Sequence, residues 1–164
     1  MRRLAALLSL LTTIGCKAPE PPPPTTAGVS MTLQYPVLLI GQAALDLRDS
    51  EEALTSIPGA SSLNLNERTI LDSAGRLFTV TRAVPIAGQK SVMWDMGTSA
   101  RRYAVTVEGK GEVPWRDVQN LVLAEVKKPT GNWAGNERAV QRVQALTDVR
   151  SLIEACRETW AWTR

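Results

Sequence analysis

Residues 69–81, TILDSAGRLFTVT, decide the fold because they predict a β-hairpin. Two short runs of β-branched and apolar residues flank the tetrapeptide DSAG. Asp72 opens this tetrapeptide and Gly75 closes it, which is the placement that a type I turn favours. Strands joined by so short a connection pair in antiparallel fashion, so we expect a sheet that extends outward from this hairpin.

Two other segments predict further strands. Residues 33–40, LQYPVLLI, are short, apolar and followed by Gly41, as expected of a buried strand. Pro36 indicates an edge position or a place near the strand start, because proline cannot donate a ladder hydrogen bond. In residues 103–107, tyrosine and valine alternate with alanine and threonine, which is the two-residue period of a strand.

Helices are predicted between and after these strands. In residues 49–54, DSEEAL, a capping residue precedes two acids, which predicts a short helix that ends before Pro58. Pro114 suits the first position of a helix up to Lys128. Residues 121–126 within that segment could instead form a strand. One face of this helix would hold Trp115, Val118, Leu121, Val122 and Val126.

The last predicted helix has the clearest periodicity. It follows a cap at Thr147 or Asp148, and residues 140–146 before it could be helix or strand. Its apolar positions have helical spacing and are Val149, Leu152, Ile153, Cys156 and Trp160. Together the elements predict an α+β domain, with a mostly antiparallel sheet and two or three helices packed on one face.

The composition excludes several classes of function. The chain has 164 residues, with 19 Lys and Arg, 16 Asp and Glu, and no His. Ser-His-Asp and Cys-His catalysis are therefore excluded, and the commonest metal ligand is missing. The formal charge is only +3 and falls to +1 without Arg2 and Arg3. This balance does not indicate a nucleic-acid partner.

The N-terminus predicts export. Arg2 and Arg3 precede a mainly apolar run from Leu4 to Ile14, which is too short to span a bilayer and matches the apolar region of a signal peptide. An ordinary signal peptide or a short buried helix would be the alternatives.

The sequence Thr13-Ile14-Gly15-Cys16 resembles the lipobox of bacterial lipoproteins, with Thr13 in the place where that family usually has Leu. The resemblance implies that residues 1–15 are a lipoprotein signal peptide and that Cys16 carries acyl chains such as palmitate. Lys17 stands where an Asp would favour inner-membrane retention. The implied location is therefore the outer membrane of a bacterial envelope, facing the periplasm.

A proline-rich tether is expected after Cys16. Residues 17–29, KAPEPPPPTTAGV, favour polyproline II, a semi-rigid spacer. A ligand for a polyproline-binding partner would be the alternative for Pro21 to Pro24. We thus expect an acylated tether at residues 16–30 and one α+β domain at residues 31–164.

Two groups of side chains are candidates for chemistry within the domain. Cys156 is the one thiol left if Cys16 is acylated, and its apolar helical position predicts a core residue rather than a nucleophile. A segment of four carboxylates could bind a cation or a cationic partner, although a helix N-terminus also favours acids. It lacks the spacing of a calcium loop, and we expect no metal, no cofactor and no catalysis. Its members are Asp46, Asp49, Glu51 and Glu52.

Tryptophan supplies five of the eight aromatic residues. Trp94, Trp133 and Trp162 stand in loop-like or terminal contexts, where they could be interface anchors or could cover the core. Trp115 and Trp160 fit helical stripes and are expected in the core.

These features favour a non-enzymatic binding lipoprotein. Its small α+β domain on a tether resembles the immunity proteins that neutralise secreted toxins, which cover a toxin's active site and need no catalytic residues. The four carboxylates, together with Trp94, Trp133 and Trp162, are the candidate contacts. An envelope housekeeping lipoprotein that binds peptidoglycan or an assembly complex is the alternative.

Overall fold

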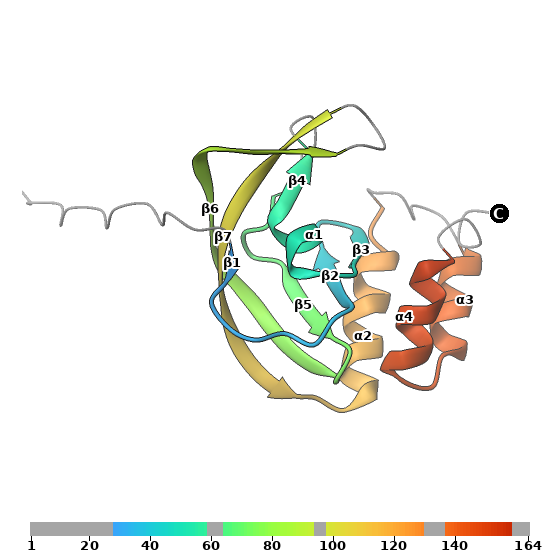
Figure 1. Cartoon of the computed structure of the whole chain (residues 1–164). Helices are drawn as coiled ribbons and strands as arrows, with labels where there is room; N and C mark the ends of the chain where they lie inside the picture. The colour runs from blue at the N-terminus through green and yellow to red at the C-terminus, as the bar shows by residue number, and fades with distance from the viewer. Residues whose placement is uncertain (1–27, 59–63, 94–97, 130–136, 159–164) are drawn as a thin grey trace, which may run out of the picture.

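The computed structural model describes residues 28–58, 64–93, 98–129 and 137–158. These residues form an α+β fold with one mixed seven-stranded sheet and four helices (Figure 1). The elements in chain order are β1 (Gly28–Val29), β2 (Val37–Gly41), β3 (Ala44–Arg48), α1 (Glu51–Thr55), β4 (Ser56–Pro58), β5 (Thr69–Asp72), β6 (Arg76–Met93), β7 (Thr98–Glu112), α2 (Trp115–Val126), α3 (Glu137–Ala145) and α4 (Val149–Arg157).

The sheet has the strand order β1-β7-β6-β5-β2-β3, and β4 also pairs with β7. Only the β1–β7 pair is parallel among the described strands, so the expectation of a mostly antiparallel sheet is confirmed. The hairpin at residues 69–81 is present as β5 and β6, with Thr69 opposite Thr79 and Leu71 opposite Leu77.

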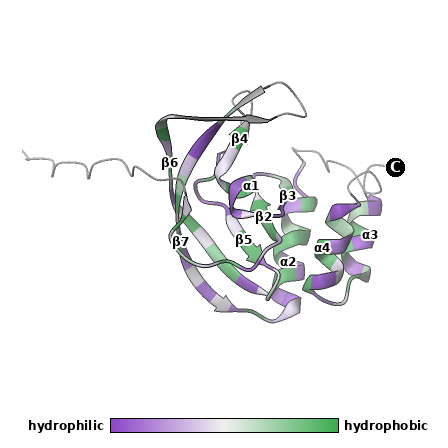
Figure 2. Cartoon of the chain, viewed as in Figure 1, coloured by the Kyte–Doolittle hydropathy of each residue, from purple (hydrophilic) through white to green (hydrophobic). Residues whose placement is uncertain are grey.

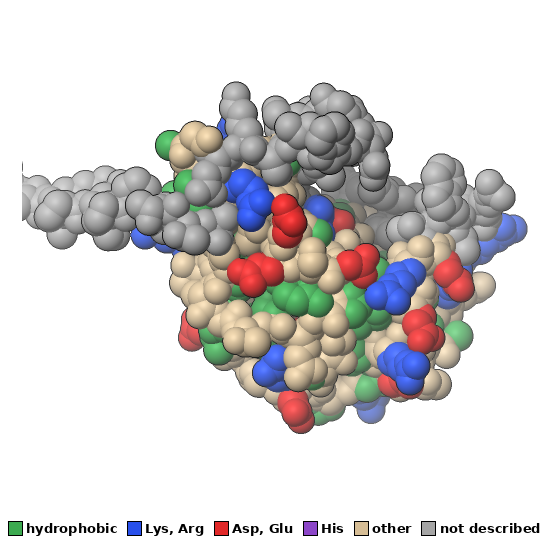
Figure 3. Space-filling view, viewed as in Figure 1, with side chains coloured by type: hydrophobic (Ala, Val, Ile, Leu, Met, Phe, Trp, Pro, Cys, Tyr) green, Lys and Arg blue, Asp and Glu red, His purple; other side chains and the backbone are tan. Residues whose placement is uncertain are grey.

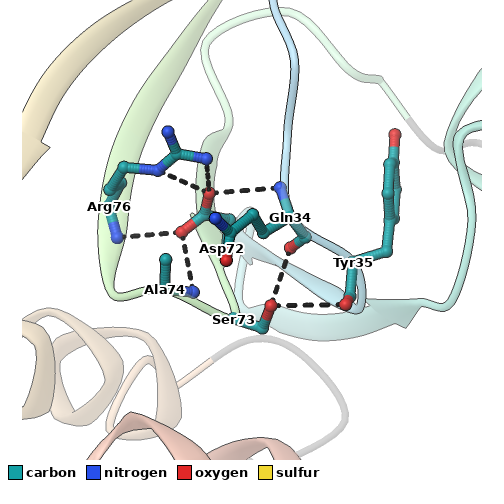
Figure 4. Close-up of polar contacts among 6 residues, drawn as sticks. All are labelled: Gln34, Tyr35, Asp72, Ser73, Ala74 and Arg76. Atoms are coloured by element: carbon teal, nitrogen blue, oxygen red, sulfur yellow. Dashed lines mark hydrogen bonds and ion pairs between the residues drawn. The ribbon is translucent and has the colours of Figure 1, made fainter.

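The turn between β5 and β6 is organised by Asp72, whose surface is completely buried (Figure 4). Its carboxylate accepts hydrogen bonds from the backbone N–H groups of Ala74 at 3.1 Å, Arg76 at 3.0 Å and Gln34 at 3.3 Å. The Arg76 guanidinium donates two more, at 2.6 and 2.9 Å. Gly75 supplies the positive φ of 81° that closes the turn. The turn residues predicted from the sequence therefore fill the roles expected of them.

Strands β6 and β7 pair as a hairpin and are much longer than the strands predicted to end at residue 81 and to cover residues 103–107. The register of the hairpin shifts at three places, the widest between Pro85 and Lys90, and β6 bends sharply along its length (Figure 1). Gly88, with a φ of 79°, lies within that widest shift and permits the irregular backbone. The hairpin consequently curls the sheet around α1 and β4 (Figure 1).

Strand β2 lies between β3 and β5 and is buried on both faces. Leu38 and Ile40 belong to one apolar cluster, whereas Val37 and Leu39 belong to the other. This double burial explains the continuous apolar run, which an amphipathic strand would not show. Pro36 lies immediately before the strand, so it marks the strand start and not an edge.

Three helices cover one face of the sheet. Helices α2, α3 and α4 contribute to the cluster that contains Leu38 and Leu71, whereas Leu54 of α1 packs in the cluster on the other side. Residues 121–126 and 140–145 are thus helical, which resolves both ambiguities. In Figure 2, α2 beside the sheet is mainly hydrophobic, and α3 and α4 carry more hydrophilic residues.

The helix caps agree with the sequence within one residue. Pro114 is the N-cap of α2 and not its first helical residue. Asp148 caps α4 and forms a capping box with Ser151, while Ser50 caps α1 by accepting a hydrogen bond from the Ala53 N–H.

The sheet begins before the predicted start of the domain at Met31. Gly28 and Val29, which the sequence assigned to the tether, pair with Ala104 and Val105 of β7. The Ser30 N–H adds a hydrogen bond of 3.0 Å to the carbonyl of Val105. The boundary at residues 30 and 31 is therefore shifted toward the N-terminus.

Candidate binding surface

The four candidate carboxylates lie along β3 and α1, but they do not converge. Asp46 pairs with Arg48 within β3 at 2.6 Å. Glu51 accepts a hydrogen bond from the Val29 N–H at 2.9 Å, which holds β1 against α1. Each of these carboxylates is engaged by its own neighbour, so they share no central position.

The other two carboxylates reach distant elements. Asp49 contacts Arg157 of α4 at 3.1 Å, and Glu52 contacts Arg102 of β7 at 3.1 Å. Within the described ranges, no group of three or more His, Cys, Asp or Glu side chains could hold a metal ion. The segment thus has the geometry of a row of three separate ion pairs and one hydrogen bond to the backbone.

Three of the four side chains in these two long-range pairs are exposed, and the fourth, Arg102, is 27% exposed. The side chains of Asp49 and Glu52 are 69% and 71% exposed, and that of Arg157 is 54% exposed. Ion pairs in such positions contribute about 0–1 kcal/mol to stability because water competes for both partners. Loss of these two ion pairs would therefore cost the fold little.

A groove of about 320 Å³ lies beside this row, between α4 and the start of β2. Pro36 and Ile153 are its apolar lining, and its polar lining is Ser73, Arg150, Glu154 and Arg157. Ser73 is fixed there because its hydroxyl donates to the carbonyls of Gln34 and Tyr35, at 3.1 and 3.3 Å (Figure 4).

The groove and the row of carboxylates form one continuous surface, because Arg157 lines the groove and also pairs with Asp49. We call this surface the α1–α4 surface. Figure 3 shows the same side of the molecule, with acidic and basic side chains interleaved and apolar side chains between them.

The sequence predicted the carboxylates of this surface but missed the groove. Arg150, Glu154 and Arg157 share one side of the last helix, at spacings of four and three residues. This spacing of charged residues could have been recognised in the sequence, next to the apolar positions of the same helix. The opposite wall, Pro36 and Ser73, is assembled only by the fold.

Several predicted site residues lie outside the described residues, namely Cys16, Trp94, Trp133 and Trp162. Trp160 also lies outside them. Trp115, expected in the core, is only partly buried and packs against the cluster formed by α2, α3 and α4. Among the residues that the structure describes, no helix is both long and apolar enough to cross a membrane.

Cys156 is a core residue, as predicted. Its side chain is buried in the cluster formed by α2, α3 and α4. Burial raises the pKa of its thiol to about 12, and the positive charge of Arg142 offsets only part of this effect. A nucleophilic thiolate is therefore disfavoured at this position at neutral pH.

Comparison with known protein families, curated proteins and solved structures finds no match for this chain.

Proposed function

We propose that the protein is a non-enzymatic lipoprotein of the bacterial envelope that binds another protein, and that it is an immunity-type protein against a secreted toxin. Acylation at Cys16 anchors it, the proline-rich segment spaces it from the outer membrane, and the domain faces the periplasm. The anchor is supported by the charged, apolar and Gly15-Cys16 segments in the order that lipoprotein signal peptides have.

The continuity of the α1–α4 surface carries the proposal for protein binding. A groove with apolar and charged lining, next to exposed ion pairs, provides contact area and charge pairing together, which are the two components of a protein interface. Such a surface blocks a toxin by covering it, and this requires no reacting group.

The position of the tether supports the groove end of this surface, whereas its other end reaches β1 through Glu51. The described chain begins at β1, which pairs with β7 at one end of the strand order, whereas α4 lies beside β3 at the other end. Figure 1 shows β1 and α4 on opposite sides of the molecule. A membrane anchor ahead of β1 leaves the groove turned toward the periplasm.

The test is capture by the full-length chain from cells of the source organism, followed by identification of the bound protein. Stoichiometric capture of one secreted toxin, and protection of cells that produce this toxin, are expected. The Arg150→Glu and Arg157→Glu double variant should lose both effects. The matched control is Arg116→Glu, on an exposed position of α2.

Two outcomes would overturn the proposal. If the double variant still captures the partner, the α1–α4 surface is not part of the interface. Recovery of peptidoglycan or of an envelope assembly complex, without a toxin, would instead establish the housekeeping alternative.

A further inference from the structure

Four charged side chains at the groove form a row of alternating sign, which we call the charge row. Arg150 Nε contacts Glu154 Oε1 at 3.2 Å, and Arg157 Nη2 contacts Asp49 Oδ1 at 3.1 Å. Glu154 and Arg157 are three residues apart in α4, so they are neighbours on the helix surface. These contacts fix the order of the row as Arg150, Glu154, Arg157 and Asp49.

The charge row faces away from the core. The side chains of Arg150 and Glu154 are 88% and 62% exposed, and those of Arg157 and Asp49 are exposed as well. Figure 3 shows acidic and basic side chains interleaved over α4. All four charges are therefore accessible to another molecule.

An alternating row of four charges is complementary to a second copy of itself. When two copies meet in antiparallel orientation around a two-fold axis, Arg150 faces the second copy's Asp49. In the same arrangement, Glu154 faces the second copy's Arg157. Every contact across the axis then joins opposite charges, whereas two rows in parallel orientation would bring like charges together at every position.

The groove lies at the centre of this arrangement. Glu154 and Arg157, the two middle members of the charge row, both line the groove. The two-fold axis passes between them, so the two grooves meet there and bring the apolar lining of Pro36 and Ile153 into the contact. One side of a helix and a loop make a small interface, so we expect the association to be weak and reversible.

We propose that the charge row and the groove form the interface of a symmetric homodimer, in which two α4 helices pair in antiparallel orientation. The complementarity of the row with a second copy carries this inference, and no toxin is needed for it. Because the proposed function uses the same groove, a second copy and a toxin exclude each other there. The dimer keeps the groove covered, and toxin binding requires its dissociation.

Sedimentation velocity of the full-length chain, at low salt and at protein concentrations from about 1 μM to about 1 mM, measures the association. A transition from monomer to dimer is expected within this range. Sodium chloride at about 1 M shortens the screening length to about 3 Å, so it should weaken the dimer about tenfold.

Two single variants and their mixture identify the interface. Arg150→Glu and Asp49→Arg each place like charges together at two positions across the axis, so each variant alone should stay monomeric. Mixed in equal amounts, they again have opposite charges at every position and should form a heterodimer. Both substitutions are at exposed side chains, so the fold is retained. The matched controls Arg116→Glu and Asp117→Arg, at exposed positions of α2, should dimerise like the wild type.

A wild type that stays monomeric over the whole concentration range would overturn the homodimer. Dimers that persist in either single variant would show that another part of the chain associates, and they would overturn it as well. The same holds if the mixed variants do not associate. Because no toxin takes part in this experiment, a negative result leaves the proposed function to its own capture test.

Discussion

The carboxylate of Glu125, near the C-terminal end of α2, accepts a hydrogen bond of 2.9 Å from the backbone N–H of Ala43. Ala43 and Gln42 form the turn between β2 and β3, and both have positive φ values, 56° and 55°. Non-glycine residues rarely adopt this conformation. The contact therefore holds a strained turn and also joins the helical layer to the edge of the sheet.

Replacing Glu125 by Ala should lower the free energy of unfolding by about 2 kcal/mol, because the buried Ala43 N–H loses its acceptor. Glu125→Gln keeps an acceptor oxygen and should cost less. Urea unfolding measures both. The control Lys128→Met removes only the exposed partner and should change stability by at most about 1 kcal/mol. An equal effect of Glu125→Ala and Lys128→Met would argue against this role of the carboxylate.

Replacing Glu67 by Gly should raise the free energy of unfolding by about 0.5–1 kcal/mol. Glu67 is exposed and has a φ of 67°, a conformation that costs energy for a residue with a β-carbon. Glu108→Gly, at an exposed position of β7, is the matched control and should destabilise. Denaturant unfolding compares the two, and destabilisation by both would contradict the strain at Glu67.

Cys156 should make stability depend on alkaline pH. Its folded pKa of about 12 lies above the ordinary value of 9, so the unfolded chain releases the thiol proton first as pH rises. The stabilisation is complete below pH 9 and is lost between pH 9 and pH 12. The stability advantage of the wild type over Cys156→Ala should fall by about 1 kcal/mol from pH 8 to pH 10. If the stability difference between the wild type and Cys156→Ala stays constant from pH 8 to pH 10, the thiol has the same pKa in the folded and unfolded states.

The Cys16→Ser variant should move from the membrane fraction to the soluble fraction, because it cannot be acylated. Fractionation of cells that produce each form is the measurement, with Cys156→Ala as the matched cysteine control. Membrane association that persists in Cys16→Ser would disprove the lipid anchor.

Local signals in the sequence were sufficient for much of the fold. The turn residues Asp72 and Gly75 determine the β5–β6 hairpin, and the apolar spacing from Val149 to Cys156 determines α4. Both depend on residues close together in the chain, which a sequence pattern records directly.

Strand β3 and the extension of β6 were missed because they are not signalled by residues close together in the chain. The turn at Gln42 and Ala43 lacks the Asn-Gly or Asp-Gly pair that normally signals such a turn. It is supported from far along the chain by Glu125. The groove beside α4 was missed because one wall is a helix face and the other a loop distant in sequence.

The parallel pairing of β1 with β7 has a consequence for the order of assembly. Gly28 and Val29 leave the ribosome early, but their partners Ala104 and Val105 follow only after five further strands and α1 have been synthesised. Pairings between residues so far apart form slowly, because a long loop must close first. Strand β1 therefore joins the sheet late, after the β5–β6 hairpin can already have formed.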